Sequence, residues 1–253
     1  MSVTLSRRRL IVTGLTAAAG ASGIAAAVHL ADHHGLIPPD HGGLFGVGET
    51  LTYAAQRVLA GDASLAREFS RGDISDVIPV NGGPPENETY QRLLAGGFRD
   101  WRLRVDGLVA RPTSFSLAEL KGYPSRSQIT HQACEEGWSF IAEWTGVQLS
   151  YVLDLVGVDP RARYVVFFPF EEFWESIDMA DALHPQTFLA YGMNGRDLPT
   201  GHGAPVRLRV ARQLGYKSIK YLSRITVTDT IASFGKGLGG ANPEGGYSWW
   251  AGI

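Results

Sequence analysis

The chain has 253 residues, with 23 Lys or Arg against 25 Asp or Glu, so its formal net charge of −2 does not point to nucleic-acid binding. A chain of this length can bury a sizeable core as one large domain with extensions. The single cysteine excludes an intrachain disulfide, a c-type haem attachment motif and a cysteine-ligated iron–sulfur cluster.

The N-terminus has the features of an export signal. Arg7, Arg8 and Arg9 precede an Ala- and Gly-rich stretch, Leu10 to Ala31, that contains no Lys, Arg, Asp or Glu. A basic start before a mildly apolar segment is typical of export signals, and the arginine run is similar to the twin-arginine type. We assign residues 1–31 to such a signal, with an N-terminal membrane anchor as the alternative. The protein is therefore expected to be exported to the periplasm or another extracytoplasmic site, free or tethered by this segment.

Residues 32–74 are interpreted as a linker followed by a helical segment. The first part is rich in His, Gly and Pro, whereas residues 49–60 have apolar residues at helical spacing. The Gly, Pro and Asn content of residues 77–90 predicts a loop.

The first strongly patterned strand begins at Trp101. Trp101, Leu103 and Val105 alternate with polar residues, and Asp106 and Gly107 follow. This pattern predicts a strand that enters a tight turn.

Two short helices and four more strands follow. Ser116 and Glu119 have the spacing of a capping box and predict the first helix, and residues 149–157 are expected to form the second. The remaining strands are expected over residues 163–170, 187–198, 204–212 and 222–229. Strands dominate without regular βαβ alternation, so the predicted fold class is α+β, with a mixed β-sheet and short helices.

Cys134 has three possible roles in the sequence. It could be a small buried hydrophobe, a nucleophile with His131 as its base, or a metal ligand. Glu135 and Glu136 follow directly, and adjacent carboxylates disfavour a thiolate unless a strong positive charge lies opposite. A metal ion would supply that charge, so the local sequence favours metal ligation over covalent catalysis.

A second cluster of chemical interest extends from His202 to Ile225. The strand pattern places Arg207 and Arg209 opposite the apolar residues, and Gly215 permits a tight turn before the lysines. Such a cluster suits phosphate or another anion, and a solvated basic edge strand is the alternative. The basic residues are Arg207, Arg209, Arg212, Lys217, Lys220 and Arg224.

Three segments carry a family resemblance. They are "CEEGWS", "HPQTFLAYGMNGRDLPTGHGAPVRL" and "LGYKSIKYLSRITVTD". In this order they resemble the molybdopterin-binding domain of the sulfite oxidase family, over residues 75–229. Together with the arginine run, they make the chain similar to exported bacterial members of that family.

The resemblance implies a molybdenum–molybdopterin cofactor. Cys134 falls at the position of the family's molybdenum ligand, and Arg207 matches a cofactor-binding arginine. Pro169 falls where a relative contacts the cofactor through Thr, and a proline cannot make that hydrogen bond. The other cofactor contacts that the resemblance implies are Asn81, His202, Lys217, Ser218, Ile219 and Lys220.

The resemblance further implies an oxidoreductase that transfers oxygen to or from a small substrate. Glu135 and Glu136 would repel sulfite, so reduction of a small sulfoxide or of methionine sulfoxide is expected over sulfite oxidation. Electrons are expected from a separate partner, with a membrane haem protein as the candidate. A sulfite dehydrogenase-like oxidase and a non-catalytic binding protein remain as alternatives. Residues 230–253 are expected to pack on the domain, with docking of the partner as the other possibility.

Overall fold

The computed structural model describes residues 21–33, 36–41, 46–60 and 64–253, which divide into two compact units, residues 1–61 and residues 62–253. The first unit contains two helices, α2 (Ala21–His33) and α3 (Gly46–Ala60), and α3 includes the helix expected over residues 49–60. The arginine run of the expected export signal lies outside the described residues. Among the residues that are described, no helix is both long and apolar enough to cross a membrane.

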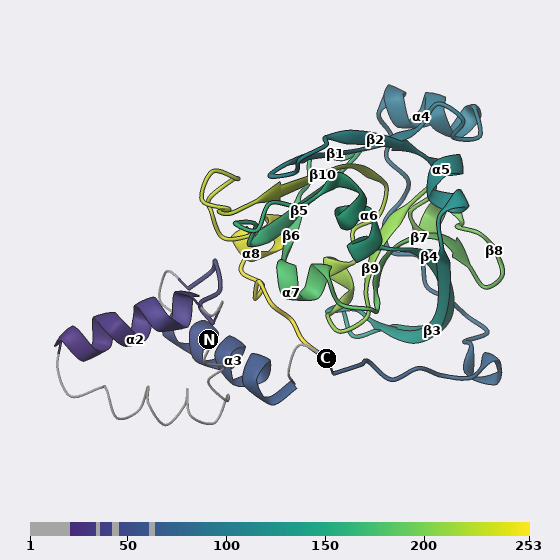
Figure 1. Ribbon diagram of the computed structural model, residues 1–253. Coiled ribbons are helices and arrows are strands. Elements are labelled where there is room, and N and C mark those ends of the chain that lie inside the picture. Colours follow the sequence, from purple (N-terminus) through teal and green to yellow (C-terminus); the bar gives the residue numbers. More distant parts are fainter. Residues whose placement is uncertain (1–20, 34–35, 42–45, 61–63) are drawn as a thin grey trace. The chain divides into compact units, whose positions relative to one another are not determined.

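Two five-stranded sheets form the second unit (Figure 1). The mixed sheet has the order β2-β1-β10-β5-β6, and only its β1–β10 pair is parallel. The antiparallel sheet has the order β3-β4-β7-β8, and β9 also pairs with β7. The strands are β1 (Arg102–Gly107), β2 (Thr113–Ser116), β3 (Ser125–Ala133), β4 (Ser139–Gln148), β5 (Tyr164–Pro169), β6 (Glu175–Asp178), β7 (Thr187–Met193), β8 (Arg196–Asp197), β9 (Arg207–Val210) and β10 (Leu222–Thr228).

The helices of this unit are short, as expected. Ser116 caps α5 and Glu119 completes the predicted capping box, since each accepts a hydrogen bond from the other's backbone N–H. Helix α6 ends at Gly157, whose φ of +68° is the left-handed conformation that favours glycine. The helices are α4 (Glu88–Ala95), α5 (Leu117–Gly122), α6 (Leu149–Val156), α7 (Met179–Ala182) and α8 (Ala241–Glu244), with 3₁₀ turns η1 (Arg71–Asp73), η2 (Thr200–His202) and η3 (Gly215–Lys217).

The main core contains buried residues of both sheets and of α6. The predicted alternation in β1 is confirmed, because Trp101, Leu103 and Val105 are all fully buried in this core. A second cluster includes Phe140 and Trp144 of β4 with residues of β7. The antiparallel sheet is therefore covered on both faces, which explains why every residue of β7 is buried.

The α+β class is confirmed, and the expected mixed sheet has a second, antiparallel sheet beside it. The hairpin of β3 and β4, which holds Cys134 in its loop, was not predicted. The buried positions of β3 are Gln128, Thr130 and Gln132, which are all polar. A strand whose buried face is polar lacks the apolar alternation on which the sequence-based prediction depends.

The C-terminal residues 230–253 belong to the second unit and pack against its other residues. Trp249 Nε1 donates to Ser176 Oγ at 2.9 Å, and Trp250 Nε1 donates to Asp181 Oδ2 at 2.9 Å. Both tryptophan side chains are buried. This segment therefore forms part of the fold around the mixed sheet.

Candidate active site

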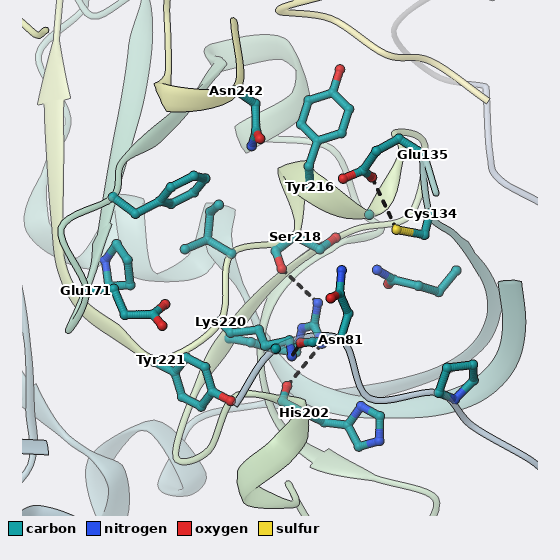
Figure 2. Close-up of a pocket in the computed structure, with 18 of the residues that line it drawn as sticks. Asn81, Cys134, Glu135, Glu171, His202, Tyr216, Ser218, Lys220, Tyr221 and Asn242 are labelled. Carbon is teal, nitrogen blue, oxygen red and sulfur yellow. Dashed lines mark hydrogen bonds between the residues drawn. The ribbon is translucent and has the colours of Figure 1, made fainter. Parts of the chain in front are cut away.

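A cavity of about 320 Å³ lies in the second unit, beside the Cys134 loop (Figure 2). Its walls come from segments far apart in the sequence, including residues 79–83, the β3–β4 hairpin, residues 169–173 and residues 215–221. The predicted site residues that line it are Asn81, Cys134, His202, Arg207, Ser218, Ile219 and Lys220. Pro169 lines it as well. The structure thus brings together residues as far apart in the sequence as Asn81 and Lys220.

Lys217 is the exception among the predicted cofactor contacts. Its side chain is fully buried outside the cavity, with Nζ 3.2 Å from Glu175 Oε1 and 3.2 Å from the Ser176 carbonyl. The ring of Trp249 lies 5.4 Å from the same Nζ. Lys217 ends the 3₁₀ turn η3 and points away from the cavity, whereas Lys220, three residues later, lines it. The expectation that Lys217 contacts the cofactor through its side chain is therefore corrected.

Cys134 follows the last residue of β3, in a loop closed by backbone hydrogen bonds. Its N–H donates to the Trp138 carbonyl at 2.9 Å, and Gly137 takes a φ of +90° within the loop. The Sγ atom lies 3.4 Å from Glu135 Oε2 and 3.9 Å from Glu136 Oε2. The side chain therefore faces the cavity with two carboxylates beside its sulfur.

Burial is the main cause that raises the pKa of the Cys134 thiol to about 11. A hydrogen bond from the Glu136 backbone acts against this shift, while the hydrogen bond to Glu135 and both glutamate charges add to it. A thiol with this pKa is a poor nucleophile. His131 does not assist it, because alternation along β3 places His131 on the exposed face and Gln132 on the buried face. The alternative of a covalent thiol enzyme is therefore not supported by the geometry.

The two glutamates occupy different positions. Glu136 is exposed and accepts a hydrogen bond from Trp138 Nε1 at 2.7 Å. Glu135 is half-buried and lines the cavity, next to the sulfur of Cys134 (Figure 2). An anion that enters the cavity would meet the Glu135 carboxylate beside the thiol.

Arg207 lies on β9, for which a solvated basic edge strand was the alternative interpretation. All four residues of β9 are buried, so this alternative is wrong for Arg207 and Arg209. The guanidinium of Arg207 donates to the His202 carbonyl at 3.0 Å and to the Ser218 carbonyl at 2.7 Å. Burial lowers its pKa to about 10, and the ring of Trp144 lies 5.0 Å from its guanidinium carbon. Arg207 therefore supports the loop at Ser218 and adds positive charge to the cavity wall.

Lys220 lies at the same side of the cavity. Its Nζ donates to the carbonyls of Asn81, at 2.5 Å, and Gly201, at 2.8 Å. Burial and the charge of Arg207 lower its pKa to about 8, while Glu171 acts against this shift. The lysine thus connects the loop at residues 79–83 to the loop at residues 215–221.

His202 presents a neutral imidazole to this group. Burial, followed by the charges of Arg207 and Lys220, lowers its pKa to about 4. Its ring packs edge-on against Phe140, with 6.1 Å between centroids. The left-handed Gly203 that follows, at a φ of +108°, lets Lys220 approach, because a Cβ there would lie 2.8 Å from the Lys220 Cβ.

Sequence reasoning missed several residues that line the cavity. Tyr216 and Tyr221 stand directly beside Lys217 and Lys220 in the sequence, and this position could have indicated that they line the cavity. Gln132 and Asn242 gave no signal in the sequence. Gln132 is buried, and its Oε1 has no hydrogen-bond partner among the described residues. The residues missed were Gln132, Tyr216, Tyr221, Glu171 and Asn242.

The charges around the cavity fit an anionic ligand with a metal-binding end. Among the residues that the structure describes, no carboxylate forms an ion pair with Arg207, Arg209 or Lys220. Buried cations bonded only to neutral acceptors are stabilised by a bound anion such as a phosphate. Cys134 offers a thiol, a ligand that prefers soft metals, to the same cavity.

Residues 93–233 match a protein-family model described as the oxidoreductase molybdopterin binding domain. The chain belongs to this family. The resemblance to the sulfite oxidase family drawn from three sequence segments is therefore confirmed, and the protein is a molybdopterin-dependent oxidoreductase.

Two relatives show the range of the similarity. A protein of Azospira oryzae, named provisionally as protein-methionine-sulfoxide reductase subunit YedZ1, is 41% identical over 188 residues, which are 74% of this chain and 68% of that protein. The protein-methionine-sulfoxide reductase catalytic subunit MsrP of Xanthomonas campestris is 37% identical over 147 residues, which are 52% of this chain and 46% of that protein. The match thus spans less than half the length of the Xanthomonas relative.

A solved structure supports the fold. The sulfane dehydrogenase SoxCD from Paracoccus pantotrophus superposes with a TM-score of 0.50 at 25% identity, over 52% of this chain and 39% of that one. This chain is therefore related to proteins named for reduction of a sulfoxide and to one named for oxidation of a sulfur compound.

Proposed function

We propose that this protein is an exported catalytic subunit that reduces a sulfoxide-like substrate at a molybdenum–molybdopterin cofactor. The observation that carries the proposal is that one cavity is lined by the Cys134 thiol and by two cations, the buried Arg207 and the half-buried Lys220 (Figure 2). The names of the Azospira and Xanthomonas relatives support the substrate class.

Different residues of the cavity would hold the two ends of the cofactor. Cys134 would ligate the metal through its sulfur and lose its proton on doing so. Arg207, Lys220 and the loop at Ser218 would hold the anionic end. When bound, the cofactor supplies the chemistry of oxygen-atom and electron transfer. The chain's own contribution is to hold the cofactor, exclude water and orient the substrate.

The wall around Cys134 favours a neutral substrate. The Glu135 carboxylate lines the cavity beside the thiol, so an incoming sulfite dianion would meet like charge. Trp138, Phe140 and Phe173 add apolar surface to the same wall. A sulfoxide has no net charge and an apolar substituent, and both properties fit this lining.

A second candidate is oxidation of a sulfur compound, which the likeness to the sulfane dehydrogenase favours. The two candidates differ in the direction in which electrons flow. The carboxylates beside Cys134 are the reason that we place reduction of a neutral substrate first.

We further propose that a separate protein supplies the electrons, with a membrane haem protein as the candidate. The single cysteine rules out a c-type haem attachment motif and a cysteine-ligated cluster in this chain, which favours an electron source in another protein. The names of both relatives describe subunits, which supports such a partner. Export rests on the arginine run that precedes the Ala- and Gly-rich segment.

The test is to purify the full chain from a host that makes molybdopterin and to measure its molybdenum and pterin content. Turnover is then assayed with methionine sulfoxide and an N-oxide, using a reduced dye as donor, and with sulfite, using an oxidised dye as acceptor. We expect about one metal and one pterin per chain, with fastest turnover on the sulfoxide. Sulfite turnover above sulfoxide turnover would favour the second candidate, and a protein with neither metal nor pterin would favour a non-catalytic binding protein.

A further inference from the structure

Arg209 is a fully buried arginine that does not line the cavity. It follows Arg207 on β9, and within the described part of the chain it has no carboxylate partner. Its Nε is buried without a hydrogen-bond partner, and burial with the nearby charge of Arg207 lowers its pKa to about 9. Burying a guanidinium that no carboxylate neutralises costs free energy of folding. A role beyond stabilising the fold would explain why Arg209 is kept at this position.

The guanidinium of Arg209 joins two walls of the cavity. Its Nη2 donates to Thr130 Oγ1 at 3.1 Å and to the His131 carbonyl at 2.7 Å, both on the strand that leads into Cys134. Its Nη1 lies 3.4 Å from Ser218 Oγ, in the loop that we assign to the anionic end of the cofactor. One planar group thus connects the segment with the thiol to the segment with the anion site.

Ser218 is held from two sides by this arrangement. Its carbonyl accepts from Arg207 at 2.7 Å, and its hydroxyl accepts from the Val210 N–H at 3.1 Å as well as from Arg209. The guanidinium carbons of the two arginines lie 5.0 and 5.5 Å from the ring of Trp144, which restrains both. Loss of Arg209 would therefore remove one of three hydrogen bonds to Ser218 and both of its bonds to the end of β3, and so break the link between the two segments.

We propose that Arg209 is a positioning residue that fixes the spacing between the Cys134 strand and the Ser218 loop, so that both ends of one cofactor are held at once. This inference rests on the proposed function for the cofactor. The order that Arg209 gives to these two segments is a property of the chain, and hydrogen exchange measures it with or without the cofactor.

The test compares Arg209→Met, which keeps the volume but removes the charge and its bonds, with Arg209→Lys. Arg212→Met is the matched control, because Arg212 is also buried on the same segment but pairs with Asp181, at 3.8 Å. Hydrogen exchange is followed in peptides that cover residues 125–138 and 214–221, and pterin release is followed after gel filtration of the purified full-length protein. The thermal midpoint is recorded for each variant.

We expect Arg209→Met to speed both hydrogen exchange in the two peptides and pterin release, each by about tenfold or more. Arg209→Lys should give intermediate rates, and Arg212→Met should give rates near those of the wild type. The inference is overturned if exchange in either peptide is unchanged in Arg209→Met, or if Arg212→Met speeds both peptides equally. Full rescue by lysine also overturns it, because lysine lacks the planar fork whose two separate nitrogens bond the β3 strand and the Ser218 loop in Arg209. Wild-type protein that holds no pterin contradicts the proposed function instead, and the exchange data still decide the role of Arg209.

Discussion

The sulfur of Cys134 faces a cavity that is also lined by Arg207 and Lys220, and the metal-ligand role proposed for Cys134 makes a direct prediction. Cys134→Ser should abolish turnover and leave the fold intact, because serine is nearly isosteric and the cysteine forms no disulfide. A serine hydroxyl is a harder and far less acidic donor than a thiol, so it should not replace a thiolate on molybdenum. Turnover, molybdenum content and the visible spectrum are measured together. A merely structural cysteine would leave activity near the wild-type level.

The cations opposite this sulfur give a second prediction. Arg207→Ala and Lys220→Ala should each weaken cofactor retention by about ten- to a hundredfold, since a charge-assisted hydrogen bond to phosphate contributes about 1.5–3 kcal/mol. Pterin content after dilution and gel filtration is the measurement, with the exposed Lys236→Ala as the control. Full retention in both variants would show that these side chains are not phosphate ligands.

His202 predicts a pH dependence of stability. Its pKa is lowered from 6.5 to about 4 in the folded protein, so between these values the unfolded chain binds a proton that the folded chain does not. The free energy of unfolding should therefore decrease as the pH falls from 6.5 to 4, and His202→Gln should remove about 1–3 kcal/mol of that decrease. Urea unfolding at pH 7 and pH 4.5 measures the difference, and an equal decrease in the variant would contradict the assignment.

At the scale of elements, the β3–β4 hairpin delivers Cys134 to the cavity, although the polar buried face of β3 hides it from sequence patterns. Gln128, Thr130 and Gln132 are buried there because Arg209, the cavity and neighbouring amides provide polar surroundings. The strand that leads into Cys134 thus lacks the apolar alternation that marks β1.

The C-terminal segment is the second element with consequences for the site. Trp249 packs over Lys217 and donates to Ser176, while Tyr216 of the cavity wall donates to the Ser248 carbonyl at 2.5 Å. Trp249→Ala should lower the free energy of unfolding by about 3–5 kcal/mol, as expected for a buried tryptophan.

The half-exposed Tyr247 is the control for this segment, and Tyr247→Ala should cost about 1 kcal/mol or less. Urea unfolding compares the two variants. Equal effects would show that the segment only rests on the surface.

At the scale of the whole molecule, the proposed export depends on the N-terminal arginines. Changing Arg7, Arg8 and Arg9 to lysine should leave the protein in the cytoplasm, because the twin-arginine pathway recognises arginine and not charge alone. Cell fractionation with a tagged full-length chain measures this, and unimpaired delivery of the triple variant would contradict the signal type. An electron donor outside the cytoplasm is needed only if export occurs, so this result also bears on the partner.

The sequence by itself determined what depends on local physics and on motifs. The apolar alternation at Trp101 and the capping box at Ser116 follow from neighbours along the chain. The placement of Cys134 among the expected cofactor contacts follows from the resemblance of three segments to a known family. Tertiary structure alone decided that Lys217 turns away to Glu175, that Arg209 bridges two walls, and that Asn242 reaches the cavity. The physical reason is that the direction of a side chain in a loop, and the partner of a buried charge, are set by segments that meet only when the chain folds.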